Sequence, residues 1–308
     1  MATRFDTARR QLGRELGPYG VFTASGGSST TLVCQPAFLS SALPSDHLAY
    51  AWVFAPSLTA PRLRRATATG LDAGTGTITV EAAFGASVTN GTVFEVSPKL
   101  PPTHEFLAGT GGHALGQSLA GCLNLALQHL LMDDDQYAIS LVSQQRDYSV
   151  AAWLNRPDRL VDVRVLDALG NGYVATHHMY ELRPGGRQPT LHFPQPFRFS
   201  GTYSMRLVVK RPADTLISVG GTWTDSTTGV VNESDEAGVE LRDWVTVALA
   251  FAYRALRDRS RGAEKATYDE LYTTQVRAAR QVHNYDHSND IDPAVARTTT
   301  PTAGTEAA

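Results

Sequence analysis

The pattern of hydrophobic and polar positions changes its period several times along the chain. Residues 4–16 place apolar side chains at helical spacing with arginines between them, and Gly17-Pro18 ends this pattern, which predicts a short helix. From Val21 to Pro98, short alternating runs are separated by glycine-rich and Asn-Gly turns. This stretch predicts a small β-unit with one face exposed.

Leucine spacing then predicts a long helix. Pro101-Pro102 breaks the preceding strand, and Thr103 is the predicted N-cap. Leucines recur every three or four residues from Leu115 to Leu131, so we expect a helix of about 20 residues that ends near Asp133. The strand-like runs from Tyr137 to Trp223 are closely spaced, which predicts an antiparallel sheet or sandwich.

Two further amphipathic helices are expected near the C-terminus. One apolar stripe runs from Leu241 through Trp244 to Leu256, and another runs from Tyr268 to Ala279. We expect these two helices and the leucine helix to cover the second sheet. Residues 286–308 lose all periodicity and are polar and threonine-rich, which predicts an extended tail that orders only on a partner.

The predicted fold class is therefore α+β. Residues 1–100 form an N-terminal helix and a small β-domain in this prediction, residues 101–285 form a main domain of helix, sandwich-like sheet and two C-terminal helices, and residues 286–308 form the tail. A chain of 308 residues agrees with about two compact domains.

Composition narrows the function classes. The 27 basic and 30 acidic side chains give a net charge of -3, so no global positive field indicates nucleic-acid binding. Cys34 and Cys122 are too few for a disulfide scaffold or a four-thiolate metal site, which favours a reduced compartment. The N-terminus lacks the apolar core of a secretory signal, and LAGCLNLALQHLLM is shorter than a membrane span of ~20 residues, so we expect a soluble protein.

Four short motifs fall short of a catalytic or metal site. Residues 109–116, GTGGHALG, lack the parallel strand and the Gly-Lys-Ser/Thr of a phosphate loop, and we interpret them as a hinge. Asp133–Asp135 lack the spacing of a calcium loop, and His177-His178 would point to opposite faces of a strand. Asn232–Ser234 match a glycosylation acceptor, but we interpret them as a polar loop. No Gly-x-Ser-x-Gly motif is present either, so we expect no enzyme activity, no catalytic residue, no cofactor and no bound metal.

Arginines gather in two places. The first cluster is Arg62, Arg64 and Arg65, and the second, at the end of a predicted helix, is Arg254, Arg257, Arg259 and Arg261. We interpret both as strand-surface and helix-end charges, since cations at a helix C-terminus interact favourably with the helix dipole. A surface that faces DNA or an acidic partner stays open.

Three segments carry a resemblance through their order and spacing. They are ARRQLGRELG, RLRRATATGLDAGTGTITVEAAFGASVTNGTVFEVSP and DWVTVALAFAYRALRDRSRGAEKATYDELY. In these segments the chain resembles the head-to-tail adaptor, or connector, proteins of tailed bacteriophages, which sit under the portal. Those adaptors are mostly helical, and the large β-region from Tyr137 to Trp223 departs from them. Adaptor, stopper and other neck proteins therefore all stay open.

The resemblance implies a non-enzymatic virion protein of the neck, made in the host cytoplasm. It implies a homo-oligomeric ring matched to the twelve-fold portal, with its helices near the ring's core. The portal protein and a tail or stopper protein are the implied partners, and the leucine and Trp244 helices are candidates for ring contacts or for the subunit core. A passive contact with DNA in the channel stays open, and no membrane partner is expected.

A different function class also stays open. A β-sandwich with exposed Trp52, Trp153 or Trp223 could bind carbohydrate, as a binding module or as a glycan-active enzyme whose paired carboxylates are not located. A connector is expected to form an oligomer or assemble with portal, whereas a glycan-binding module is expected to stay monomeric and to be retained on a glycan column.

Overall fold

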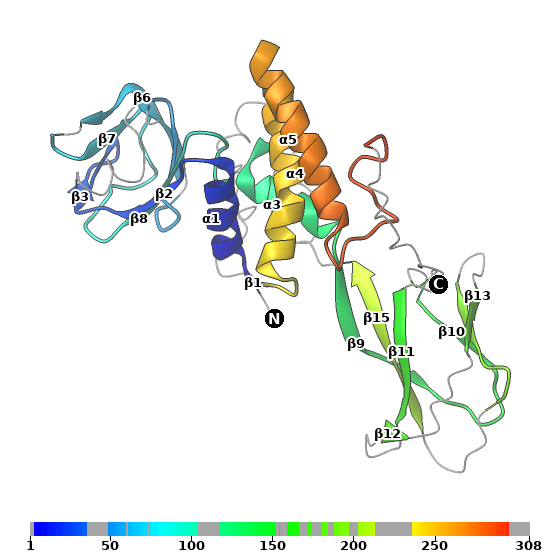
Figure 1. Ribbon diagram of the computed structural model, residues 1–308. Coiled ribbons are helices and arrows are strands. Elements are labelled where there is room, and N and C mark those ends of the chain that lie inside the picture. The colour runs from blue at the N-terminus through cyan, green and yellow to red at the C-terminus, as the bar shows by residue number, and fades with distance from the viewer. Residues whose placement is uncertain are drawn as a thin grey trace, which may run out of the picture. The chain divides into compact units, whose positions relative to one another are not determined.

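The structure of the chain is a computed structural model (Figure 1). The structure describes residues 3–35, 49–59, 61–72, 74–103, 117–151, 154, 159–166, 172–173, 180–183, 188–196, 203–212 and 236–295. Helices and antiparallel sheets both contribute a large part of the described chain, so the predicted α+β class is confirmed. Contacts divide the chain into two compact units, Met1–Leu130 with Ala213–Ala308, and Leu131–Pro212.

The first unit contains a small closed β-sheet. Its strands pair in the order β2-β8-β5-β6-β7-β4-β3. Their bounds are β2 Gly20–Thr23, β3 Gly26–Gly27, β4 Thr31–Val33, β5 Trp52–Phe54, β6 Leu63–Asp72, β7 Thr77–Val80 and β8 Val93–Ser97. The two ends of this order, β2 and β3, belong to the continuous segment 20–27, so the sheet closes on itself.

Alternation along these strands builds the interior of the closed sheet. The buried interior cluster includes Phe22, Leu32, Val53, Ile78 and Phe94. Strand β5 is buried on both sides, because its other face places Trp52 and Phe54 in a second cluster with Leu63. The β-unit predicted between Val21 and Pro98 is therefore present, and β5 has no exposed face because the N-terminal helix lies beyond it.

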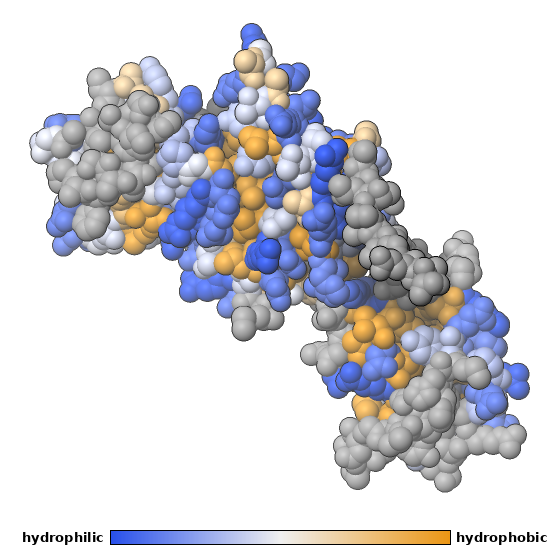
Figure 2. All heavy atoms as spheres, in the orientation of Figure 1, coloured by the Kyte–Doolittle hydropathy of each residue, from blue (hydrophilic) through white to orange (hydrophobic). Residues whose placement is uncertain are grey.

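Four helices lie in the described part of the first unit: α1 (Phe5–Leu16), α3 (Leu119–Leu127), α4 (Leu241–Arg259) and α5 (Gly262–Arg280). Helices α4 and α5 lie side by side, and α1 and α3 both pack against α4 (Figure 1). Trp244 is fully buried at their centre, where its indole N–H donates to the Leu123 carbonyl at 2.8 Å. On the face drawn in Figure 2, hydrophilic residues cover much of the helices, and hydrophobic residues show between them. The predicted apolar stripes of α4 and α5 thus form the core of a helical layer.

The helix predicted from the leucine spacing is shorter than expected. Only α3 is helical among the described residues of that stretch, and its N-cap is Ser118, whose hydroxyl accepts from the Gly121 N–H at 3.0 Å. Strand β9 begins directly at Leu131. The predicted helix end at Asp133 was wrong, because pairing with a strand some 75 residues later extends this stretch and overrides its local leucine periodicity.

The second unit is built from β-strands. One antiparallel sheet has the order β12-β11-β15-β9, and a three-stranded sheet has the order β10-β14-β13. Their bounds are β9 Leu131–Ser140, β10 Asp147–Ser149, β11 Leu160–Leu166, β12 Gly172–Tyr173, β13 Glu181–Arg183, β14 Thr190–His192 and β15 Ser204–Pro212. Residues of both sheets, among them Tyr148, Val163, Leu191 and Leu207, share one apolar core. The second antiparallel β-region predicted from the sequence is present.

The helices do not belong to the unit of the second sheet. The sequence predicts that the leucine helix and the two C-terminal helices cover that sheet, but they fall within the first unit, where their apolar faces pack on one another and on α1. The second unit, Leu131–Pro212, is preceded and followed in the chain by segments of the first unit, so the β-unit is an insertion. The predicted boundaries at residues 100 and 285 both fall inside the first unit.

The predicted tail begins later than expected. After α5, residues 281–295 turn back along the helices, and the described chain ends at Val295. The Asp286 N–H donates to the His129 carbonyl at 2.8 Å, and Leu130 forms a β-bridge with Tyr285. Residues 286–295 are thus part of the fold, and residues 296–308 lie outside the described residues. A two-stranded pairing of β1 (Thr3–Arg4) with β16 (Glu236–Ala237) completes the first unit.

Candidate functional site

A buried ion pair joins α1 to the closed sheet. Arg9 donates from Nε and Nη2 to the two carboxylate oxygens of Glu95, at 3.0 and 2.8 Å, and the side chains are 1% and 0% exposed. Arg10 donates to the same carboxylate at 2.9 Å, and the Tyr19 hydroxyl donates to it as well. The Arg9 guanidinium also lies over the Phe54 ring, 5.0 Å from its centroid. This network is a structural lock between α1 and the closed sheet, because each oxygen of the Glu95 carboxylate accepts two hydrogen bonds.

Burial and neighbouring charges together set the pKa values of Glu95 and Tyr19. Burial alone would raise the pKa of Glu95, but the Arg9 charge and the hydrogen bonds from Arg9, Tyr19 and Arg10 outweigh it and lower that pKa. Burial raises the pKa of Tyr19 well above its ordinary value, and the neighbouring Glu95 charge adds to this. Gly13 is required beside the lock, because a Cβ at that position would overlap the Tyr19 ring. Glu95 is therefore ionised and Tyr19 neutral at neutral pH.

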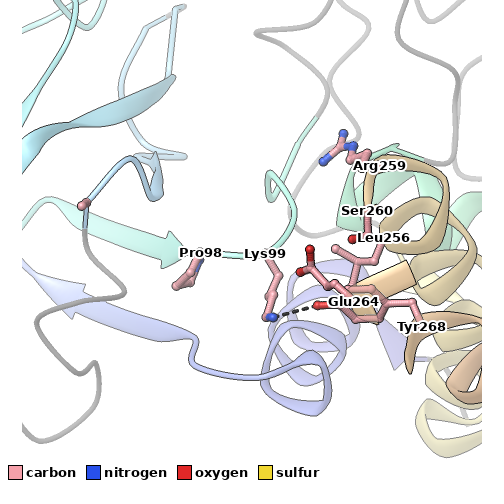
Figure 3. Close-up of a pocket in the computed structure, with 8 residues that line it drawn as sticks. Pro98, Lys99, Leu256, Arg259, Ser260, Glu264 and Tyr268 are labelled. Carbon is pink, nitrogen blue, oxygen red and sulfur yellow. Dashed lines mark hydrogen bonds between the residues drawn. The ribbon is translucent and has the colours of Figure 1, made fainter. Parts of the chain in front are cut away.

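A pocket of about 430 Å³ opens in the first unit. Its walls come from the segment after β8, from the end of α4 and from the start of α5, and its lining residues are Ala49, Pro98, Lys99, Leu256, Arg259, Ser260, Glu264 and Tyr268. Figure 3 shows Lys99 reaching toward Tyr268, to whose hydroxyl its ammonium donates at 2.8 Å, and Glu264 extending into the same space. Arg259 lines the other side of the pocket.

Arg259, from the second arginine cluster of the sequence, lines this pocket. Burial lowers the pKa of Arg259 below its ordinary value, and the nearby positive charge of Arg65 lowers it further, against the opposing effect of Cys122. Arg259 donates to the carbonyl and the side-chain oxygen of Gln117 at 3.1 and 3.3 Å. Arg65 stacks on the Trp52 ring at 4.8 Å, and among the described residues its buried Nε has no hydrogen-bond acceptor. Arg259 is therefore held by Gln117, and Arg65 is held by the Trp52 ring.

Several arginines of the first unit pair with carboxylates. Arg9 pairs with Glu95, Arg257 pairs with Asp258 and Asp269, and Arg280 pairs with Asp290 at 2.7 Å. Arg65, Arg259 and Lys99 have no carboxylate within 4.0 Å among the residues with a described placement. The remaining first-cluster residues are held locally, since Arg62 lies over Phe54 and Arg64 donates to the Ala83 carbonyl.

The other residues that the sequence singles out lie either outside the described residues or within regular structure. Residues 109–116, 177–178 and 232–234, together with Trp153 and Trp223, lie outside the described residues. Asp133–Asp135 belong to strand β9 and not to a helix end. Trp52 is only 9% exposed and is covered by Arg65, so it offers no open stacking surface.

Both cysteines are buried thiols. Burial raises the pKa of Cys34 to about 11 and that of Cys122 to about 12, so neither is a thiolate at neutral pH. Over the described ranges, no three His, Cys, Asp or Glu side chains gather as a metal site. No described helix combines the length and the apolar character needed to cross a membrane.

Sequence reasoning missed two arrangements. Lys99 follows Pro98 in a turn, and no local pattern marks it. Arg280 is buried at the end of α5, where it donates to Asp290, to the Val295 carbonyl and to the Asp292 carbonyl, the last two at 2.6 Å. The aspartates of NYDHSNDID could have indicated this arrangement. They follow directly after a predicted helix that ends in arginine, and a carboxylate there can fold back and pair with that arginine. Comparison of the chain with protein-family models and with curated proteins finds no match.

Proposed function

We propose that the protein is a structural virion component of a tailed bacteriophage, a head-to-tail connector that forms a homo-oligomeric ring between portal and tail. In this proposal the protein catalyses no reaction. Its task is to present one surface to the next copy in the ring and others to the proteins above and below it. The neck of the virion is its proposed location.

The observation that supports this best is the inserted β-unit. Leu131–Pro212 has a core separate from that of the helical layer, so one chain carries two folded bodies. A ring subunit needs two different contact patches, because head-to-tail interfaces join unlike surfaces. The inserted unit also carries the two most exposed large apolar side chains of the described chain, Val142 at 54% and Val161 at 51%.

The polar groups of the first unit fit a scaffold. Arg9, Glu95 and Tyr19 fasten α1 to the closed sheet, and Arg280 fastens the segment after α5 to the helices. Such buried, fully used networks fix the geometry of a subunit, as a ring that must close requires. The leucine and Trp244 helices are core elements of the subunit, so ring contacts on this proposal come from other surfaces.

The proposal is tested by the mass and shape of the purified full chain. Light scattering coupled to size exclusion is expected to show a multimer, or a monomer that becomes a ring when portal is added, and negative-stain images are expected to show rings. Val142→Glu with Val161→Glu is expected to weaken assembly while leaving the circular dichroism of the subunit unchanged. A chain that stays monomeric with and without portal, and is retained on a glycan column, would support carbohydrate binding instead.

A further inference from the structure

The loop that joins β9 to β10, residues 141–146, holds an exposed apolar side chain in a fixed position. Val142 is 54% exposed, more than any other large apolar side chain of the described residues. The Tyr148 hydroxyl accepts from the Val142 N–H at 3.4 Å and donates to the Val142 carbonyl at 3.1 Å. The Tyr148 ring is buried in the core of the second unit, where it packs edge-on against Phe193. The backbone of Val142 is therefore fastened to the core while its side chain faces water.

Backbone hydrogen bonds order the rest of the loop. The Gln145 N–H donates to the Val142 carbonyl at 3.1 Å, and the Phe193 N–H donates to the Arg146 carbonyl at 2.9 Å. Gln144 has a φ of 67°, a left-handed conformation that residues other than glycine rarely adopt. A loop that is already ordered loses little conformational entropy when a partner binds it, so this loop is suited to present Val142 to another protein surface.

The charge beside Val142 indicates which surface fits the loop. Arg146 is exposed at the other end of the loop and belongs to no ion pair among the described residues. An apolar side chain next to an arginine is complementary to an apolar side chain next to a carboxylate. Helix α5 offers this combination, because Leu271 is 37% exposed and the adjacent Glu270 is exposed as well. The preceding carboxylate, Asp269, is already in an ion pair with α4.

We propose that Val142 and Arg146 of one copy of the chain dock on Leu271 and Glu270 of the next copy. The inference rests on the proposed function, since it names the two surfaces that meet in the ring. The loop belongs to the second unit and α5 to the first, so the two surfaces are unlike, and each copy gives its loop to one neighbour and its α5 to the other. A contact between unlike surfaces continues around a ring, whereas a surface that meets itself ends in a dimer. The occupant of the α5 surface is therefore a second copy of this chain.

An exchange of charges tests the pairing. The association of the purified full chain with itself is measured from the concentration dependence of its mass, without and with portal. Arg146→Glu and Glu270→Arg are each expected to weaken association about tenfold or more, because each variant places like charges opposite one another. The double variant restores opposite charges and is expected to associate like wild type. Glu81→Arg is the matched control, because Glu81 is an exposed glutamate of the closed sheet; it is expected neither to weaken association nor to rescue Arg146→Glu.

Tyr148→Phe tests the fixed loop separately. The variant keeps the buried ring and removes only the hydroxyl that holds the Val142 backbone, so association is expected to weaken although Val142 itself is unchanged. Tyr180→Phe is the control, because the Tyr180 ring contacts the same Phe193, and it is expected to leave association unchanged. Equal association of the two variants would show that the hydroxyl does not prepare the loop for binding.

A disulfide between copies tests the position of the contact. Chains with Val142→Cys are mixed with chains with Leu271→Cys, and dissolved oxygen accepts the two electrons and two protons that the thiols lose as the S–S bond forms. A covalent dimer is expected in the mixture and not in either variant alone. The native Cys34 and Cys122 are buried and do not take part.

The outcomes separate this contact from the proposed ring. A wild-type chain that associates with itself, while Arg146→Glu associates equally well or the charge exchange gives no recovery, would overturn the contact and leave the ring standing. A wild-type chain that never associates with itself, alone or with portal, would overturn both.

Discussion

Replacing Glu95 by glutamine removes the negative charge that holds α1 to the closed sheet. The carboxylate accepts from Arg9 twice, from Arg10 and from Tyr19. Glutamine keeps one acceptor oxygen but turns an N–H₂ group toward one of these donors. Arg9 would then remain charged and only 1% exposed, with the Glu95 carboxylate lost. Its Phe5 and Phe54 neighbours offer ring faces but no counter-charge.

The expected loss in free energy of unfolding is about 3–5 kcal/mol, the range for breaking a buried ion pair by removing one partner. Arg10 contributes little to this loss, because its side chain is 30% exposed and can turn to water. The loss comes mainly from Arg9, which cannot reach solvent while α1 stays packed. Replacing the whole buried network by apolar residues, as in Arg9→Met with Tyr19→Phe and Glu95→Leu, is expected to restore most of the stability.

Urea denaturation at pH 7, followed by circular dichroism and tryptophan fluorescence, measures the change. Glu181→Gln is the control, because Glu181 pairs with Arg183 at 2.9 Å with both side chains more than half exposed. That variant is expected to change the free energy of unfolding by less than about 1 kcal/mol. A loss below about 1 kcal/mol for Glu95→Gln, or a triple variant no more stable than it, would refute the reasoning.

The same pair predicts a pH dependence. The pKa of Glu95 is lowered in the folded chain, so the unfolded chain takes up its proton first as the pH falls. The stabilisation by Glu95 is therefore complete above the unfolded pKa of about 4.5 and is lost as the pH falls through the folded value. The stability difference between wild type and Glu95→Gln is expected to shrink below pH 4.5. A difference that stays constant down to acid unfolding would contradict the assigned charge.

Three further predictions concern the helical layer. Trp244→Ala is expected to lower the free energy of unfolding by about 3–5 kcal/mol, because the ring is fully buried, and a melting temperature within a degree of wild type would contradict this. Ending the chain after Val295 is expected to leave the melting temperature unchanged. Ending it after Asn284 is expected to lower the melting temperature by several degrees, because Arg280 loses its partner Asp290. Equal melting temperatures of the two truncated chains would refute a stabilising role of the Arg280–Asp290 pair. Burial lowers the pKa of His129 despite the opposing effects of Asn289, Asp286 and Asp290, so the stabilisation by the neutral His129 ring is present above about pH 6.5 and decreases at lower pH. In urea titrations, the difference in free energy of unfolding between wild type and His129→Leu is therefore expected to shrink between pH 7 and 5. A constant difference would exclude the neutral ring.

Local patterns were sufficient for much of the fold. The alternation in TITV and VFEV marked β7 and β8, and the stripe through Trp244 marked the buried face of α4, because each element buries one regular face whatever partner covers it. The α+β class followed from these elements. The candidate pocket did not, because Lys99 and Arg259 are 160 positions apart and no local spacing relates them.

Which elements pack against each other was decided only by the tertiary structure. The composition of residues 286–308 predicted a free tail, but Arg280 at the end of α5 has its counter-charge in Asp290, and this buried pair holds the segment up to Val295 on the helices. In the same way, α3, α4 and α5 pack on one another and on α1 and not on the second sheet. Leu131, which continues the leucine spacing in the sequence, pairs as a strand residue with Pro212. A sequence determines which faces must be buried, since that depends on the period of its apolar residues. Which faces meet depends on shape and charge across the whole chain, and these come together only when it folds.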